Sequence, residues 1–197
     1  MRSNKKLKML LLIVAVLLVG VTVAYAALSA TLNVTINKVT QNAQTWNVQF
    51  NGTSANATAG GTSGTGRTCG AATITPAAVT IANTTLSKPD DSCLYTLTIA
   101  NTGTVNAKLT SITPTKPSDS GVTCGTLSGG KMVCGNITYT LGTTNSLTNP
   151  TLLAANQTLN AGATLTVYLV ARYSGTGVSS SAITHTGASF SLVWGQA

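Results

Sequence analysis

The stretch of sequence that decides the fold is Leu28-Ser29-Ala30-Thr31-Leu32-Asn33-Val34-Thr35-Ile36. Apolar residues occupy every second position, and small polar residues fill the positions between them. Because successive side chains of a β-strand point to opposite faces, this alternation predicts a strand with one covered and one exposed face. The side chains expected on the covered face are Leu28, Ala30, Leu32, Val34 and Ile36.

Further strand-like runs follow along the chain, separated by segments rich in Gly, Asn, Ser and Thr. They are expected at residues 46–50, 79–82, 93–100, 105–112, 121–127, 131–141, 163–173 and 188–194. Residues 51–66 carry few packing side chains and are predicted to be a surface loop, whereas residues 101–104 are predicted to be a tight turn. Short strands at this spacing predict an all-β protein, a jelly-roll-like antiparallel β-sandwich over residues 38–197.

The N-terminal 26 residues have the three parts of a signal peptide. Basic residues lie within positions 2–8, an apolar run covers positions 9–23, and Ala24-Tyr25-Ala26 offers the small residues that signal peptidase prefers. Cleavage after Ala26 would make the alternating strand the start of the mature chain. The alternative is an uncleaved anchor, but the run is shorter than the roughly 20 apolar residues of a spanning helix. We expect a secreted, extracellular protein that meets a membrane only as a precursor.

The composition limits which functions the chain can have. Charged residues make up 7% of its 197 residues, against about 25% in typical soluble domains. Four of its 11 basic residues precede the apolar run, and the other seven are scattered singly. Nucleic-acid binding depends on clustered basic contacts, so we expect no nucleic-acid partner.

The four cysteines are Cys69, Cys93, Cys124 and Cys134. In an exported chain they are expected to form two disulfides, for which three pairings are possible. Ser128-Gly129-Gly130 is typical of a hairpin turn, so Cys124 and Cys134 can face each other across paired strands, which leaves Cys69 for Cys93. Free thiols or a zinc site are the alternatives, although no pair has the spacing of a zinc knuckle.

Candidates for catalysis are few. The chain has a single histidine, His185, and no glutamate, so the paired histidines and glutamate of a zinc protease are missing. There is also no Gly-x-Ser-x-Gly motif. We therefore expect no enzyme activity and no cofactor, and we expect His185 to be a solvated loop residue. Asp90 and Asp91 have oxygens that suit calcium, but turn capping is the simpler role.

Asn-x-Ser/Thr sequons are possible glycosylation sites in a secreted chain. They occur at Asn33, Asn51, Asn56, Asn83, Asn136 and Asn156. In a chain so rich in Thr and Asn, they also arise by chance.

One central stretch carries a family resemblance. It reads Leu86-Ser87-Lys88-Pro89-Asp90-Asp91-Ser92-Cys93-Leu94-Tyr95-Thr96-Leu97-Thr98-Ile99-Ala100-Asn101-Thr102-Gly103-Thr104-Val105-Asn106-Ala107-Lys108-Leu109. Together with Ala24-Tyr25-Ala26 and the strand that follows it, this segment resembles the TasA/camelysin family of biofilm-matrix fibre proteins and the related archaeal bundling pilins. The four cysteines and the low charge depart from the bacterial members.

The resemblance implies a secreted jelly-roll subunit that polymerises head to tail by donor-strand complementation, in which the N-terminal strand of each copy completes a sheet of the next. On this sequence the donor would be residues 27–37, the product would be a cell-surface filament, and the partner would be the chain itself. The alternative is a monomeric β-sandwich adhesin or carbohydrate-binding module, secreted or surface-anchored, that packs this strand within its own domain. The alternation alone fits both.

Overall fold

The computed structural model describes residues 9, 44–61, 67–82, 84–119, 122–177 and 185–197. Apart from Met9, the predicted signal peptide lies outside the described residues, and so does all of the predicted donor strand at 27–37. The domain described below is the compact unit Gln44–Ala197.

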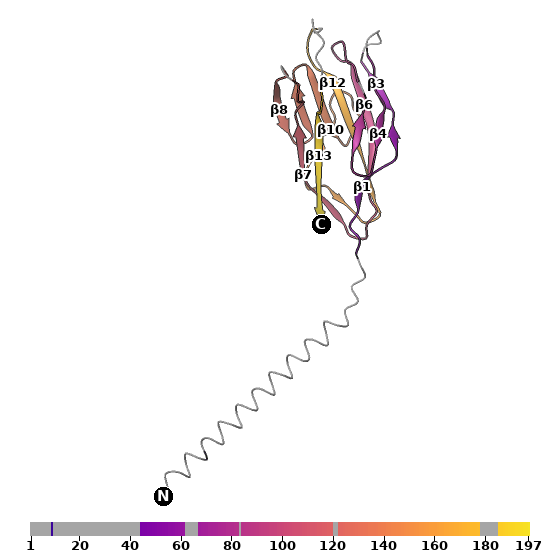
Figure 1. Cartoon of the computed structure of the whole chain (residues 1–197), viewed down its shortest axis with the longest axis vertical. Helices are drawn as coiled ribbons and strands as arrows, with labels where there is room; N and C mark the ends of the chain where they lie inside the picture. The colour runs from indigo at the N-terminus through magenta and orange to yellow at the C-terminus, as the bar shows by residue number, and fades with distance from the viewer. Residues whose placement is uncertain (1–8, 10–43, 62–66, 83, 120–121, 178–184) are drawn as a thin grey trace. The chain divides into compact units, whose positions relative to one another are not determined.

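The described residues form thirteen strands, and every pairing between them is antiparallel. The strands are β1 (Val48–Asn51), β2 (Ser54–Ala55), β3 (Ala57–Gly60), β4 (Ala72–Ile74), β5 (Val79–Ile81), β6 (Ser92–Asn101), β7 (Ala107–Thr115), β8 (Cys124–Ser128), β9 (Lys131–Cys134), β10 (Ile137–Gly142), β11 (Thr158–Leu159), β12 (Thr164–Tyr173) and β13 (Ser189–Gln196). The expected all-β sandwich is therefore observed (Figure 1).

The largest sheet has the strand order β1-β6-β12-β10-β9-β8, and β3 also pairs with β6. Its centre is the pair β6 and β12, each of ten residues. Along β6 the side chains of Cys93, Tyr95, Leu97 and Ile99 alternate onto one face and are buried. This is the face on which the hydrophobic core is built, because burial of apolar surface is the main favourable term in folding.

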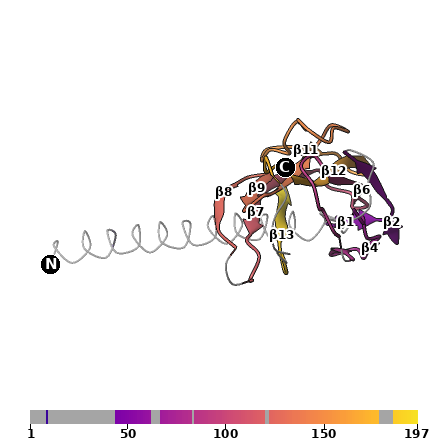
Figure 2. The same ribbon diagram turned by 90° about the horizontal axis from the view of Figure 1, so that it is seen from above.

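Two small sheets contribute to the same core. Their strand orders are β11-β7-β13 and β2-β4-β5. Leu109 and Leu159 belong to the first and Ala72 and Ile74 to the second, and all four are buried in one cluster with the inner face of β6. The view from above shows β13 and β4 at separate places along the large sheet (Figure 2). The second layer of the sandwich thus consists of two separate pieces.

The domain has a base end and a loop end. At the base end, Val48 pairs with Asn101 and Gln196 with Ala107, and the C-terminus lies there (Figure 1). The predicted turn at 101–104 is confirmed: Asn101 Nδ2 donates to the carbonyl of Val105 at 2.8 Å, and Gly103 N donates to Asn101 Oδ1 at 3.1 Å.

The same turn fixes the start of the described chain. Thr104 N donates to the carbonyl of Thr45, and Thr102 N donates to that of Asn47, both at 2.9 Å. A Cβ at Gly103 would lie 2.3 Å from the Thr45 carbonyl oxygen, so only glycine permits this close approach. At the opposite, loop end, Ser92 pairs with Gly60 and Arg172, and Ser189 pairs with Thr115.

Two predictions about elements were wrong. Residues 51–66 were expected to be loop, yet β2 and β3 lie within them and pair with β4 and β6; backbone hydrogen bonds form these strands without an apolar alternation. Residues 131–141 were expected to be one strand but are two, β9 and β10. They are separated by a turn at Gly135, whose φ of 54° lies in the left-handed region that favours glycine.

Candidate functional site

The candidate site is an apolar groove between the two pieces of the second layer. On one side lies β13, which pairs only with β7 among the described strands; on the other lies the hairpin of β4 and β5, whose turn residues Pro76 and Ala77 line the pocket and whose second strand, β5, pairs only with β4. Each strand therefore presents an unpaired edge. An unpaired edge carries free backbone donors and acceptors and can accept another strand.

Apolar side chains from both strands point to the interior but stay half-buried. On β13 they are Phe190, Leu192 and Trp194, which alternate with exposed residues, and on β5 they are Val79 and Ile81. Fully packed core residues of this chain, such as Leu109, are completely buried. The groove walls are thus a part of the core that lacks its covering layer.

The floor of the groove comes from the large sheet. Phe50 of β1 lies opposite Ile99 of β6, and Ile99 lies opposite Leu165 of β12, so the three form one row across the sheet. Ile99 is 2% exposed, whereas Phe50 and Leu165 are half-buried. The row is therefore covered at its centre and partly open at both ends, and of its three residues Phe50 and Ile99 line the pocket described next.

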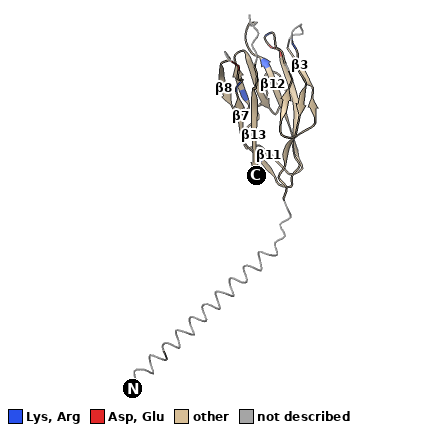
Figure 3. Cartoon of the chain, in the orientation of Figure 1, with Lys and Arg blue, Asp and Glu red and all other residues tan. Residues whose placement is uncertain are grey.

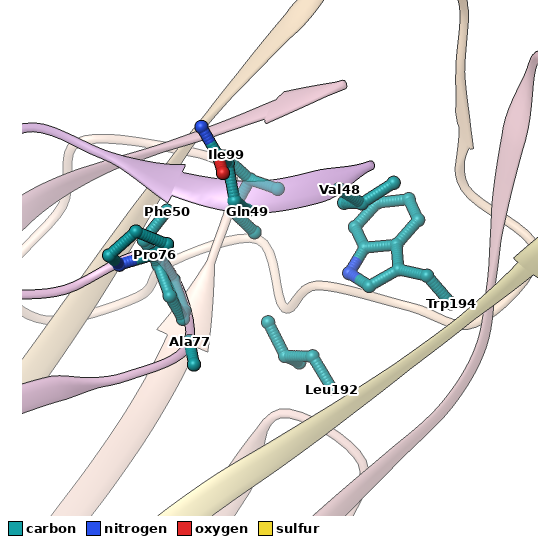
Figure 4. Close-up of a pocket in the computed structure, with 8 residues that line it drawn as sticks. All are labelled: Val48, Gln49, Phe50, Pro76, Ala77, Ile99, Leu192 and Trp194. Atoms are coloured by element: carbon teal, nitrogen blue, oxygen red, sulfur yellow. The ribbon is translucent and has the colours of Figure 1, made fainter. Parts of the chain in front are cut away.

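A pocket of about 110 Å³ lies in this groove (Figure 4). The indole of Trp194 lies beside Val48, Leu192 projects from β13 toward the opening, and Phe50 and Pro76 face it. A cavity of roughly 150 Å³ lined by aliphatic and aromatic groups can hold a benzene ring. The pocket is therefore of a size to take one apolar side chain.

Charge is absent from this surface. No charged residue is among the described residues that line the pocket, and Lys, Arg, Asp and Glu are few over the whole described domain (Figure 3). A charged ligand would lose its hydration here without finding a counter-charge. The groove suits an uncharged occupant with an apolar face.

The β5 wall is tied to the large sheet by a disulfide and by hydrogen bonds. A disulfide joins Cys69, three residues before β4, to Cys93 of β6, with a Cα–Cα distance of 5.6 Å. At the other end of the small sheet, Phe50 N donates to the carbonyl of Pro76 at 2.9 Å. Three residues past β5, the Thr84 hydroxyl also lies 3.0 Å from the Tyr95 hydroxyl of β6. This wall therefore depends on one covalent bond and a few hydrogen bonds.

The second disulfide joins Cys124 to Cys134 between β8 and β9, with a Cα–Cα distance of 4.0 Å. The turn between these strands is at Gly129 and Gly130. The hairpin argument from the sequence favoured these two pairings, and no free cysteine occurs in the part of the chain that the structure describes. This disulfide lies in the large sheet, on strands that do not line the groove.

His185 is not the solvated loop residue that we expected. Its Nδ1 lies 2.8 Å from the Tyr139 hydroxyl, and the ring is half-buried. Burial lowers the pKa of His185, an effect that the charge of Asp119 partly opposes, and burial raises the pKa of Tyr139 to about 12. Asp119 accepts a hydrogen bond from the amide of Thr186, which lowers the pKa of its carboxyl group.

The hydrogen bonds of His185 and Thr186 attach the segment before β13 to Tyr139 of β10 and to Asp119. Ser118 N donates to the carbonyl of Thr186 at 2.9 Å, next to the contacts of His185 and Asp119. Periodicity could not reveal the cluster, because it joins residues from three separate segments. It anchors one wall of the groove at the loop end.

The acidic residues at 90 and 91 act as turn and ion-pair residues. Both amides of Ser87 and Lys88 donate to Asp91 Oδ2 at 2.9 Å, and the Arg67 guanidinium lies 3.8 Å from Asp91 Oδ1. Asp90 pairs with Arg172. In the described part of the chain, no three His, Cys, Asp or Glu side chains are grouped as metal ligands.

The other predicted site residues divide into exposed and undescribed positions. The sequon residues Asn51, Asn56, Asn136 and Asn156 are exposed, while Asn33 and Asn83 lie outside the described residues. The donor residues Leu28, Ala30, Leu32, Val34 and Ile36 also lie outside them. Among the described residues, no helix has the length and apolar content needed to cross a membrane.

The groove itself was not predicted from the sequence. The alternation of residues 188–194 marked β13 as a half-buried strand, but nothing in the pattern showed that its edge lacks a neighbour.

Comparisons with models of known protein families, with curated proteins and with solved structures found no match.

Proposed function

We propose that this protein is the structural subunit of an extracellular fibre, and that residues 27–37 of one copy fill the groove between β13 and β5 of another. The observation that carries this proposal is the incomplete second layer, whose two unpaired strands flank a half-buried apolar floor. An extended segment with one apolar face would cover this floor and supply backbone partners to the two unpaired strand edges.

The predicted donor fits in pattern and in charge. Its apolar residues recur at every second position, which is the spacing of inward-facing side chains along a strand. Residues 27–37 contain no charged side chain, and none of the described residues that line the pocket is charged. Backbone hydrogen bonds would give affinity, and the alternate side chains would set the register.

The energies allow a stable contact. Burying Leu28, Leu32, Val34 and Ile36 contributes roughly 1.5 to 3 kcal/mol each, and each ladder hydrogen bond contributes about 1 kcal/mol. Association costs about 4 to 15 kcal/mol. The sum favours binding, and a head-to-tail contact that does not close on itself grows into a filament.

This proposal agrees with the family resemblance, which implies the same mode of assembly and a biofilm-matrix or pilus role. It gives no catalytic task to any residue.

Deleting residues 27–37 tests the proposal. The exported chain should form filaments in negative-stain electron micrographs, whereas the truncated chain should stay monomeric in size-exclusion chromatography. A control that keeps the length but exchanges Thr31 for Ser should assemble normally. Filaments of the truncated chain would show that another surface drives assembly, and a monomeric full-length chain would favour the adhesin or carbohydrate-binding alternative.

A further inference from the structure

The titratable cluster around His185 has no part in the proposed function. His185 Nδ1 lies 2.8 Å from the Tyr139 hydroxyl, the two ring centroids are 5.9 Å apart, and both rings are half-buried. Burial raises the pKa of Tyr139 to about 12, so its hydroxyl keeps its proton at neutral and acid pH. A neutral imidazole has one acceptor nitrogen, and Nδ1 of His185 can therefore accept the hydrogen bond that Tyr139 donates.

A proton on His185 changes this contact. Both ring nitrogens of an imidazolium are donors, so Nδ1 no longer accepts, and no other acceptor for the Tyr139 hydroxyl is found among the described residues. A donor without a partner in a half-buried position is unfavourable. Burial also disfavours the charged ring and lowers the pKa of His185, although the charge of Asp119 raises it. Protonation of His185 therefore weakens the contact.

The contact holds the chain just before β13. Thr186, the next residue, donates its amide to Asp119 and accepts a hydrogen bond from the amide of Ser118 at 2.9 Å. β13 begins three residues later, at Ser189, and pairs only with β7 among the described strands. The loop end of β13 therefore depends on this attachment as well as on its pairing with β7.

Asp119 is the charged group that acts on His185, and its charge favours the proton. The other ionisable side chains on the elements packed against the cluster are exposed, bonded elsewhere or on the opposite face of the large sheet. Lys116 is exposed, the Tyr173 hydroxyl donates to the carbonyl of Gly177 at 2.7 Å, and Lys131 and Arg172 pair with Thr140 and Thr138, which alternate with Tyr139. The balance at His185 is thus between burial and one carboxylate.

The composition of the chain makes the response of His185 separable from all others. The chain has one histidine and no glutamate, its four cysteines are in disulfides, and aspartate ordinarily titrates at about pH 3.9. The hydrogen bond from the Thr186 amide lowers the pKa of Asp119 further. Between pH 7 and pH 5, His185 is therefore the side chain that changes its charge.

We infer that residues 185–188 form a pH-sensitive latch, which is closed while His185 is neutral and which opens when His185 is protonated and frees the loop end of β13. This inference goes beyond the fibre function and does not depend on it. The open latch binds the proton more readily than the closed one, so opening becomes more favourable as the pH falls below 6.5, the ordinary pKa of histidine. Because β13 is one wall of the groove, that wall should be less ordered in mild acid.

Hydrogen exchange of the exported chain tests the latch. The reporters are the backbone amides of Ser118 and Thr186, whose hydrogen bonds keep the latch closed. After correction for the chemical exchange rate, their protection should fall several-fold from pH 7 to pH 5. The fall should not exceed about 25-fold, which is the limit for a group of pKa 6.5 that gains its proton only in the open state. The amides of β8 and β9 should keep their protection.

His185→Gln is the matched variant, because the glutamine oxygen can accept from the Tyr139 hydroxyl but takes up no proton in this range. Its Ser118 and Thr186 amides should be equally protected at pH 5 and pH 7. An equal loss of protection in the wild-type chain and the variant, or no loss in the wild-type chain, would overturn the inference.

A second measurement needs no substitution. The slow exchange of the imidazole C2 hydrogen, followed by mass spectrometry across pH, gives the protonation midpoint of His185. This midpoint should lie below 6.5, and the protection of the two amides should begin to fall below pH 6.5 and level off below the midpoint. A midpoint at or above 6.5 would show that the closed latch does not resist the proton, and the inference would fail.

Discussion

The Cys69–Cys93 disulfide should be needed for assembly, while the Cys124–Cys134 disulfide should not. The first joins the segment before β4 to β6 and so holds the β5 wall of the groove in place. The second joins β8 to β9, away from the groove. The perturbation is the double substitution of each pair by serine.

The two variants should lose similar amounts of stability. For separations of 24 and 10 residues, the entropy of the cross-linked unfolded chain gives losses of about 3.4 and about 2.7 kcal/mol. Domains are commonly stable by about 5 to 15 kcal/mol, so both variants should stay folded at room temperature. The second variant is therefore a matched control for general destabilisation.

The assay combines urea unfolding of monomers with light scattering and negative-stain microscopy of assembly. The Cys69→Ser/Cys93→Ser variant should unfold at lower urea and fail to form fibres, whereas the Cys124→Ser/Cys134→Ser variant should unfold earlier but still assemble. Equal fibre formation by both variants would refute the claim that the β5 wall is part of the acceptor site.

Three further predictions concern single side chains. Leu192→Asp should weaken assembly by at least roughly tenfold, because it removes about 1.5 to 3 kcal/mol of apolar burial from a groove wall. Val193→Asp on the exposed face (48% exposed) should change assembly little, and equal effects of the two variants in light scattering would contradict the inward placement of Leu192. Leu32→Asp should block fibres and Thr31→Asp should be much milder, which micrographs of both variants would check. Burial raises the pKa of Tyr139 to about 12 from 10.0, so the folded state holds this proton more tightly and stability should fall as the pH rises from 10 toward 12. Tyr139→Phe should reduce that loss in urea unfolding measured across this pH range. An unchanged dependence of stability on pH would show that Tyr139 does not cause it.

The sequence was sufficient to predict the fold class and the position of most strands of the large sheet, but not their order or pairing. β6 and β12 were recognisable because long runs of strand-forming residues alternate over part of their length, as at Tyr95, Leu97 and Ile99, although both strands also bury residues of the opposite face such as Leu94 and Val170. The turns at 101–104 and at Gly129-Gly130 were also predictable, since Asn and Gly fill the positions that tight turns require. Where local chemistry and tertiary packing agree, a single sequence carries enough information.

Elements without an apolar pattern could not be predicted. β3 consists of small and polar residues, and a Cβ at Gly60 would lie 2.2 Å from a side-chain carbon of Leu147. The small residue there is explained by the close approach of a distant loop, which no local pattern reveals. The division of residues 131–141 was missed although Gly135 and Asn136, which separate the runs 131–134 and 137–141, are residues typical of turns.

The candidate site exists because β13 and β5 each lack a neighbouring strand on one side among the described residues. The residue pattern within a strand does not encode whether a neighbour is missing. Leu192 and Trp194 look the same whether their strand has one neighbour or two. Only the topology shows that β13 and β5 are both edges and that the core between them is half covered. The family resemblance supplied the expectation of a donor, whereas the half-covered apolar surface beside β13 is visible only in the fold.

Binding of a synthetic peptide of residues 27–37 to the domain 38–197 tests the central claim most directly. Hydrogen exchange of the domain would be measured with and without the peptide, and a peptide with Leu32→Asp would serve as the control. One peptide should bind per domain and slow the exchange of backbone amides in β13 around Leu192 and Trp194, with no effect on β8. Unchanged exchange in β13 at saturating peptide would contradict the claim that this groove is the acceptor.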